Sequence, residues 1–353
     1  MDASARYLPH LLCLVMILGY VTGTYWAFGL VGWVQLAVPL LDHVVGEDRR
    51  PRSSHENAER AASLAIWSFG PLHLALIACG VLAVTDGFPH VGGAPLSIVQ
   101  VAIAIGAVGG MCAAPAAHEL MHQSGRLATF AASVQMMMLT YPHFCIEHVE
   151  GHHETVGTPA DPVTARAGES LYWFYPRAVC GSLVSAWRRE AARLQRAGGA
   201  PFGLRNRMVR YAAGQTLVYA AIAAFGGARG VAFFALQSVI AFSVVETINY
   251  VEHYGLTRRE LAPACYEPIT REHAWNSSHR ISNWLMFNVA RHSDHHCDSQ
   301  RAYSSLRHLD LAPRLPAGYF SMFVLALVPP LWRRVMDPRV AAWNRERRPL
   351  EGV

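Results

Sequence analysis

Apolar residues form long runs along this chain, and the runs come in pairs separated by short breaks. A helix needs about 20 mostly apolar residues to cross the hydrocarbon core of a bilayer. The pattern predicts six membrane-spanning helices in three antiparallel pairs, at residues 8–27, 28–45, 61–84, 96–117, 211–225 and 231–250. Gly23 marks the expected turn of the first pair, and Gly226 with Gly227 marks that of the third.

Arginine is distributed unevenly over the loops, and this distribution predicts the orientation of the chain. The loop after the second run holds four arginines, the stretch 166–210 holds nine, and the tail from Arg333 holds six. The loop 85–95 has none. Because short loops rich in arginine stay on the cytoplasmic side, we expect both termini and the long polar segments to be cytoplasmic, in a bacterial-type inner membrane.

Two further apolar runs do not fit this set of crossings. Residues 128–146 could span a membrane, but histidine-rich segments lie on both sides of the run. If those segments meet at one site, the run must return to the same face, so we predict a re-entrant or in-plane segment broken at Pro142. Residues 318–331, which end at Pro329 and Pro330, are predicted to be interfacial.

These patterns predict one all-α integral membrane domain over residues 1–353, with its polar regions at 118–210 and 251–353.

The composition agrees with a membrane protein. Apolar residues make up 52% of the chain and charged residues 16%, against about 25% charged in an average soluble protein. The mean hydropathy is +0.18. No two of the seven cysteines form a C-x-x-C pair, which excludes a rubredoxin-like or zinc-ribbon site within the chain. The net charge of +5 is too small to indicate a nucleic-acid partner.

Histidine carries the candidate chemistry. Nine of the 18 histidines lie in four groups at or just beyond the expected cytoplasmic ends of spans, namely His118 and His122; His148, His152 and His153; His253; and His292, His295 and His296. Residues four apart share one face of an α-helix, which pairs His118 with His122 and His148 with His152, and turns His153 about 100° away. Imidazole binds Fe, Zn, Cu and Ni, and nine imidazoles exceed the needs of one ion. The sequence therefore predicts two metal ions.

Shorter motifs leave other interpretations open. His118 and His122 match H-E-x-x-H, in which Glu119 would be the general base of an intramembrane zinc protease. Glu119 and Glu150 also begin E-x-x-H patterns, as in carboxylate di-iron bundles. Both leave most of the other histidines unexplained. A metal transporter is a further alternative, although its ligands should lie near the bilayer midplane.

The four histidine boxes, in this order, resemble those of the membrane alkane hydroxylases, within the membrane fatty-acid desaturase/hydroxylase superfamily. The box at residues 249–256 is the most specific part of the resemblance. Further similar segments cover nearly the whole chain, at residues 39–42, 46–48, 141–144, 158–162, 168–170 and 327–339.

The resemblance implies a non-haem di-iron centre whose ligands are the nine grouped histidines. It further implies hydroxylation of the terminal methyl of n-alkanes with O₂ and two electrons from a separate rubredoxin or ferredoxin. Glu252, Asn249 and Asp294 lie within the boxes, and we expect them to orient the imidazoles by hydrogen bonds. Asp161 is either a fourth such residue or a turn former before Pro162. A xylene or cymene methyl hydroxylase, or an acyl-chain desaturase with the same centre, is the alternative.

The remaining expectations concern the entry of the substrate, the docking of the electron donor and the two isolated histidines His73 and His143. The substrate should enter from the bilayer among the first four spans, where Trp33 either limits chain length or faces lipid. The arginines of residues 188–210 either dock the acidic electron donor or contact anionic lipid. His73 and His143 are expected to be satisfied core histidines rather than ligands.

Overall fold

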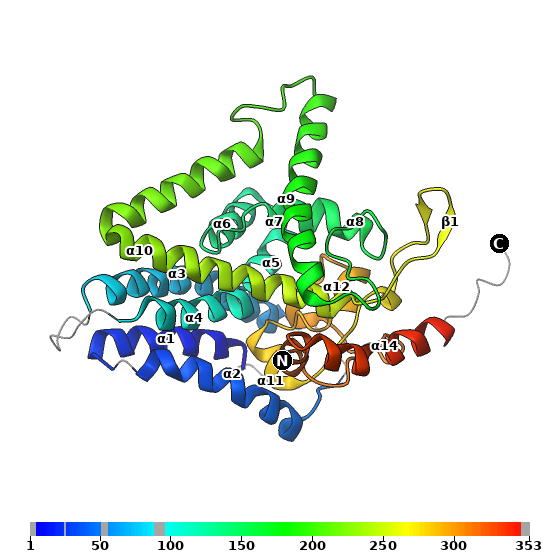
Figure 1. Ribbon diagram of the computed structural model, residues 1–353, viewed down its shortest axis with the longest axis horizontal. Coiled ribbons are helices and arrows are strands. Elements are labelled where there is room, and N and C mark those ends of the chain that lie inside the picture. Colours follow the sequence, from blue (N-terminus) through cyan, green and yellow to red (C-terminus); the bar gives the residue numbers. More distant parts are fainter. Residues whose placement is uncertain (1–4, 25, 51–55, 88–95, 347–353) are drawn as a thin grey trace.

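The computed structural model describes residues 5–24, 26–50, 56–87 and 96–346, and this part of the chain is almost entirely helical (Figure 1). The N-terminal helices are η1 (Ala5–Tyr7), α1 (Leu8–Thr22), α2 (Trp26–Val45), α3 (Glu56–Thr85), α4 (Ile98–Val108), η2 (Gly109–Ala113), α5 (Ala114–His122) and α6 (Arg126–Met137). The central helices are α7 (Phe144–Ile146), η3 (Glu147–His152), α8 (His153–Thr155), α9 (Leu171–Arg196) and α10 (Arg207–His253). The C-terminal helices are η4 (Arg271–His273), α11 (Arg280–Leu285), α12 (His292–Cys297), η5 (Tyr303–Ser305), α13 (Tyr319–Ala326) and α14 (Pro329–Glu346). Strands β1 (Glu260–Ala262) and β2 (Cys265–Tyr266) form a small antiparallel hairpin.

The described chain has four helices long and apolar enough to cross a membrane, or five if the bent halves of α2 count as one span. These helices comprise residues 5–22, 59–85, 98–122 and 207–253, and the α2 halves meet at 44°. The predicted count of six differs because the last two predicted spans lie within α10. Gly227, with φ 53° and ψ −154°, leaves the helical conformation there, and α10 reverses direction between its two arms (Figure 1). The turn expected at Gly23 is also present, with φ 72°.

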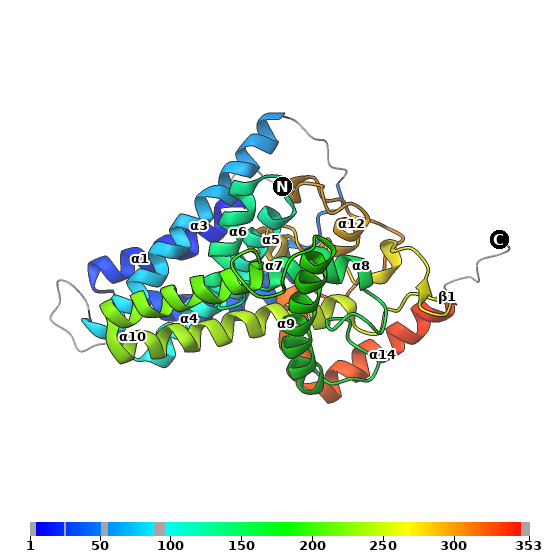
Figure 2. The same ribbon diagram turned by 90° about the horizontal axis from the view of Figure 1, so that it is seen from above.

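The apolar helices and the polar elements lie at opposite ends of the molecule. Helices α1, α3, α4 and α10 run together at one end, whereas α8, α12, α14 and the β1 hairpin lie at the other (Figure 2). Among the apolar helices, α10 packs most extensively against α4 and α3. Helices α5 and α10 therefore end near the polar elements, at His122 and His253.

Helix α6 ends well before Pro142. It stops at Met137, and Thr140 adopts a left-handed φ of 51° in the tight turn that leads to α7. The predicted break in the run 128–146 is therefore present, but the turn at residues 138–143 makes it rather than the proline alone. In the run 318–331, Pro329 begins α14 instead of ending a segment, as expected for proline in the first turn of a helix.

The packing of α4 against α10 requires a residue without a side chain at Gly106. A Cβ atom there would lie 2.6 Å from the carbonyl oxygen of Gln237 and 2.9 Å from the Cβ of Ile240, both on α10. Neither neighbour can move without displacing the α10 backbone. Gly32 on α2 has no heavy atom within 4 Å of the equivalent position.

We predict that Gly106→Ala destabilises the protein, whereas Gly32→Ala does not. Overpacking of this kind costs about 1–3 kcal/mol, which outweighs the better helix propensity of alanine. Thermal unfolding of the two variants in detergent, each compared with the parent chain, measures the difference. Equal midpoints for the two variants would show that α4 and α10 are less closely packed than described.

Candidate metal centre

All nine of the predicted histidines come together, and they form two adjacent groups. In each group, one donor atom per residue lies within 4.8 Å of all the others. The five-imidazole group consists of His118, His122, His148, His153 and His295, and the four-imidazole group of His152, His253, His292 and His296. His73 and His143 belong to neither group.

Helix geometry decides which group each histidine joins. His118 and His122, one turn apart at the end of α5, share a group as expected. The second box differs, because η3 is a π-helix, in which hydrogen bonds connect residues five apart. His148 therefore pairs with His153, and His152 turns to the other group. The shared face expected for His148 and His152 is present, since their rings stack with centroids 5.3 Å apart, but the two rings contribute to different groups.

The donor nitrogens have the spacing expected around bound ions. In the five-imidazole group, the Nε2 atoms of His148 and His153 are 3.1 Å apart, as are those of His153 and His295. In the four-imidazole group, the Nε2 of His292 lies 3.2 Å from that of His253 and 3.0 Å from that of His296. Metal–imidazole bonds of about 2.0–2.1 Å place neighbouring ligand atoms roughly 3 Å apart.

Buried nitrogens without partners support the same interpretation. The Nε2 atoms of His118, His122 and His152 are buried and have no hydrogen-bond partner. Buried polar atoms are otherwise almost always hydrogen-bonded, so an orphaned lone pair needs another partner. A cation in each group would satisfy these nitrogens.

The imidazoles outside the membrane helices are held in the form that binds metal. Burial, followed by the mutual repulsion of neighbouring imidazoles, lowers the pKa of His148, His153, His292, His295 and His296 well below 6.5. A metal ligand must be neutral imidazole, and at neutral pH these rings carry no proton that an ion would have to displace.

Two hydrogen bonds orient rings of the four-imidazole group. The Nδ1 of His152 lies 3.0 Å from Oδ2 of the buried Asp161, and the Nδ1 of His253 lies 3.2 Å from the carbonyl oxygen of His273. Because both partners accept, each Nδ1 donates and each Nε2 is left free for an ion. Burial alone would raise the pKa of the Asp161 carboxyl, but His152 and the Thr164 hydroxyl bring it below its ordinary value.

Asp161 serves both of the roles considered for it. Besides contacting His152, it accepts a hydrogen bond from the backbone N–H of Val163 at 3.1 Å, which closes the turn around Pro162. The turn holds the carboxylate beneath the imidazole.

The three residues expected to orient imidazoles behave differently from one another. Glu252 Oε2 lies 3.3 Å from Nε2 of His292. This nitrogen is the one that faces His253 and His296, so Glu252 contacts the donor atom itself instead of orienting the ring through Nδ1. Asn249 instead donates to Glu246, and Asp294 accepts from Arg307. In the described part of the chain, neither Asn249 nor Asp294 hydrogen-bonds an imidazole. Asp294 does not contact an imidazole because it lies between the histidines of α12 and faces the loop that contains Arg307.

Glu119 and Glu150, the glutamates of the H-E-x-x-H and E-x-x-H motifs, bind residues outside the two imidazole groups. Glu119 Oε2 accepts a hydrogen bond from the backbone N–H of Tyr303 at 3.1 Å. Glu150 forms a two-pronged ion pair with Arg207, at 2.5 and 3.0 Å. Neither carboxylate is part of a group that could hold a metal. The position of Glu150 outside both groups contradicts the carboxylate di-iron interpretation, and two groups of four and five imidazoles exceed the three ligands that a zinc protease needs.

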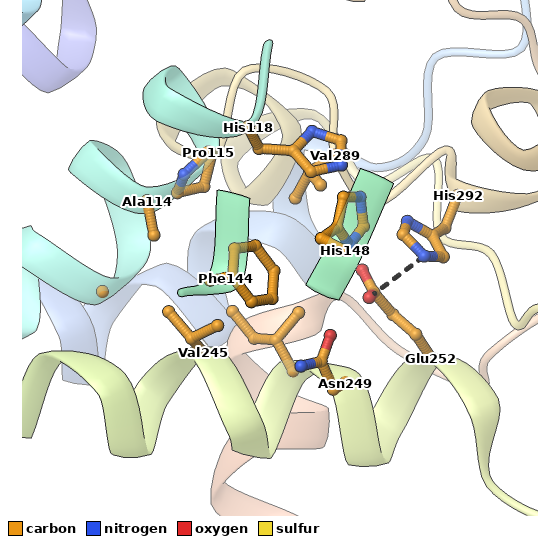
Figure 3. Close-up of a pocket in the computed structure, with 12 residues that line it drawn as sticks. Ala114, Pro115, His118, Phe144, His148, Val245, Asn249, Glu252, Val289 and His292 are labelled. Atoms are coloured by element: carbon orange, nitrogen blue, oxygen red, sulfur yellow. Dashed lines mark ion pairs between the residues drawn. The ribbon is translucent and has the colours of Figure 1, made fainter. Parts of the chain in front are cut away.

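An apolar cavity reaches both imidazole groups (Figure 3). One face of α10 forms its floor, and Phe144 stacks on the ring of His148 with centroids 4.9 Å apart. Phe144 ends the segment 141–144 but was not among the predicted site residues. The lining consists of Gly110, Ala114, Pro115, His118, Phe144, His148, Val245, Ile248, Asn249, Glu252, Val289 and His292.

Three other expectations concern residues away from the cavity. Trp33 is 72% exposed and does not line the cavity, so it faces outward from α2. His73 is buried, and its Nδ1 lies 3.0 Å from Nε2 of Gln135. His143 is buried with its ring against that of Tyr141. Both histidines are core residues rather than ligands, as predicted, but they are not fully satisfied, because the buried Nε2 of each has no hydrogen-bond partner in the described part of the chain.

Apolar helices that end at two buried imidazole groups define a class of integral membrane metalloproteins. The chain belongs to the fatty acid desaturase family, whose model matches residues 93–326.

Its relatives narrow the assignment within that family. It is 39% identical to alkane 1-monooxygenase 2 of Pseudomonas aeruginosa, over 94% of this chain and 91% of that protein. It is 36% identical to alkane 1-monooxygenase 2 of Alcanivorax borkumensis, over 91% of this chain and 85% of that protein. The xylene/toluene monooxygenase hydroxylase component of Pseudomonas putida is 30% identical over 98% of this chain and 91% of its own length.

We predict that the two imidazole groups can be emptied separately. His253→Ala removes one of four donors from its group and should leave about one bound ion per chain, and His118→Ala should do the same for the other group. Metal analysis of the purified variants measures this, with the exposed His43→Ala as control. A full complement of two ions in His253→Ala would remove that residue from the ligand set.

Proposed function

We propose that the chain is a non-haem di-iron monooxygenase that hydroxylates the terminal methyl of n-alkanes with O₂ and two electrons. The observation that carries this proposal is the apolar cavity that ends at two adjacent imidazole groups. The alkane 1-monooxygenases to which the chain is similar support the choice of substrate.

The chemistry of the substrate explains the need for metal. An unactivated C–H bond has neither an acidic proton nor a leaving group, so side-chain acid or base catalysis cannot attack it. The nine histidines would hold two irons, which would supply the activation of O₂: one oxygen atom enters the C–H bond, and the other takes up two electrons and two protons and leaves as water.

The chain itself contributes position and a dry environment. Val245, Ile248 and Phe144 line the cavity with apolar side chains, which favour the end of an alkane over water. Asp161 fixes the ring of His152, and Glu252 borders His292 at the same cavity. The substrate is positioned by shape alone, because an alkane offers no polar group to bind.

We further propose six membrane crossings, with the centre and both termini on the cytoplasmic side. Counting each arm of α10 on either side of Gly227 as a crossing adds one to the five candidates. An even number of crossings agrees with the arginine-rich stretches near both ends of the chain.

We assign the electron donor, an acidic rubredoxin or ferredoxin, to an arginine-lined cleft along α9. The cleft has a volume of about 1540 Å³, open solvent included, and Asp161 forms part of its wall. Two of its arginines are paired, Arg177 with Glu169 and Arg189 with Glu154. The cleft also contains Arg166, Arg188 and Arg196, for which the described part of the chain provides no ion pair.

This position suits electron delivery as well as binding. Asp161 reaches from the cleft wall to the ring of His152, which is one donor of the four-imidazole group. An electron-donor protein bound in the cleft would therefore be separated from the proposed metal centre only by the Asp161 side chain and its hydrogen bond to His152. Of the arginines predicted to dock the donor, Arg188, Arg189 and Arg196 line the cleft, whereas Arg193 and Arg207 are joined to the buried Glu190.

We predict that Arg188→Glu combined with Arg196→Glu raises the KM for reduced rubredoxin about tenfold or more at low salt, because like charges then face each other. The change in KM should shrink as salt rises. Arg345→Glu on the exposed part of α14 is the matched control and should leave the KM unchanged. An unchanged KM in the double variant would place the donor elsewhere.

The substrate assignment is tested with purified, iron-loaded protein, reduced rubredoxin and ¹⁸O₂. We expect n-octane to yield 1-octanol with one labelled oxygen, and faster turnover of n-octane than of p-xylene. Faster turnover of p-xylene would favour the methyl-arene alternative, which the 30% identical xylene/toluene relative represents. Double-bond formation without labelled alcohol would indicate a desaturase.

A further inference from the structure

One polar side chain in the cavity has no partner for its oxygen. Apart from the histidines, the lining carries polar side chains only at Asn249 and Glu252 (Figure 3). Both lie on the face of α10 that also presents Val245 and Ile248, since residues three and four apart share a helical face. Glu252 lies beside His292, which leaves Asn249 as the polar group next to the apolar part of the cavity.

The orientation of the Asn249 carboxamide follows from its partner. Its Nδ2 lies 3.3 Å from Oε2 of Glu246, and Oε1 of Glu246 accepts a hydrogen bond of 2.6 Å from the Tyr141 hydroxyl. Because the carboxylate accepts, the amide nitrogen must face Glu246. The amide oxygen therefore points the other way, into the cavity (Figure 3). In the described part of the chain, this oxygen has no hydrogen-bond partner.

The supporting residues hold the carboxamide rigidly. Glu246 and Tyr141 are buried, with 0% and 2% of their surfaces exposed. The Tyr141 ring stacks on Phe242 at 5.2 Å, with 13° between the planes. A fixed acceptor in an apolar cavity is costly unless something in the cavity donates to it.

We propose that Asn249 is a binding residue for the hydroxyl group of straight-chain primary alcohols, whose O–H donates to the amide oxygen. The inference rests on the proposed function, because such an alcohol is the product of that reaction. An alkane has no donor and leaves the oxygen unpaired, whereas the alcohol pairs it. Asn249 thus makes the cavity favour the alcohol over the alkane, and the product competes with the substrate.

The experiment compares a donor-bearing ligand with one that has none. The Kd of 1-hexanol for iron-loaded protein in detergent is measured by calorimetry, and the KM for n-octane is measured in turnover. For Asn249→Leu, which removes the acceptor and keeps similar bulk, we expect the Kd of the alcohol to rise about three- to tenfold. The KM for n-octane should fall instead, because the alkane no longer covers an unpaired acceptor. Ile248→Val, an apolar change on the same face, is the control and should shift both constants together.

The outcomes separate the inference from the proposed function. An alcohol Kd that is unchanged in Asn249→Leu, or that rises by the same factor as the KM for n-octane, overturns the role of Asn249. If wild-type protein oxidises no alkane, the proposed function fails, yet the calorimetric comparison still decides whether Asn249 binds alcohol. Should the leucine variant lose iron, Asn249→Ala is measured in its place, with the same rise in Kd expected.

Discussion

Nine imidazoles packed with several donor nitrogens about 3 Å apart are the constraint on which the rest of this structure depends. Each neutral ring has a single N–H to donate, so one imidazole cannot donate to two neighbours, and the Nε2 atoms of His118, His122 and His152 have no partner. A cation in each group would satisfy all of these nitrogens at once. Four separate segments must therefore end at one place, and the fold is organised so that α5, η3 with α8, α10 and α12 all do so.

Helix α10 connects the packing of the membrane helices to the chemistry of the centre. At Gly106 it approaches α4 so closely that no side chain fits between them. Further along, the same helix forms the cavity floor and ends at His253. A displacement of α10 within the apolar helices would therefore move the cavity wall and a donor nitrogen together. Metal binding and helix packing are coupled through one rigid element, which explains why close packing extends far from the site.

Sequence patterns predicted the parts of this structure that depend on local periodicity. Apolar run length located the long helices, and four-residue spacing paired His118 with His122. The π-helix at η3 was not predictable, because nothing in its residues distinguishes five-residue from four-residue spacing, and the division of His152 and His153 between the two groups was therefore not predicted. The partners of Glu119 and Glu150 were also missed. Their true contacts, Tyr303 and Arg207, are distant in sequence, and only the tertiary fold brings them close.

The segment from Glu147 to Asp161 separates two environments that the proposed reaction needs to keep apart. On one side, His148 faces an apolar cavity suited to an alkane. On the other, Asp161 and Glu150 line a polar cleft that is rich in arginine and suited to an acidic protein. The histidines of this segment join both imidazole groups, so the cavity and the cleft proposed for the electron donor both adjoin the centre through it. The π-helix thus has a consequence for the site, since its wider spacing brings His153 within reach of His148.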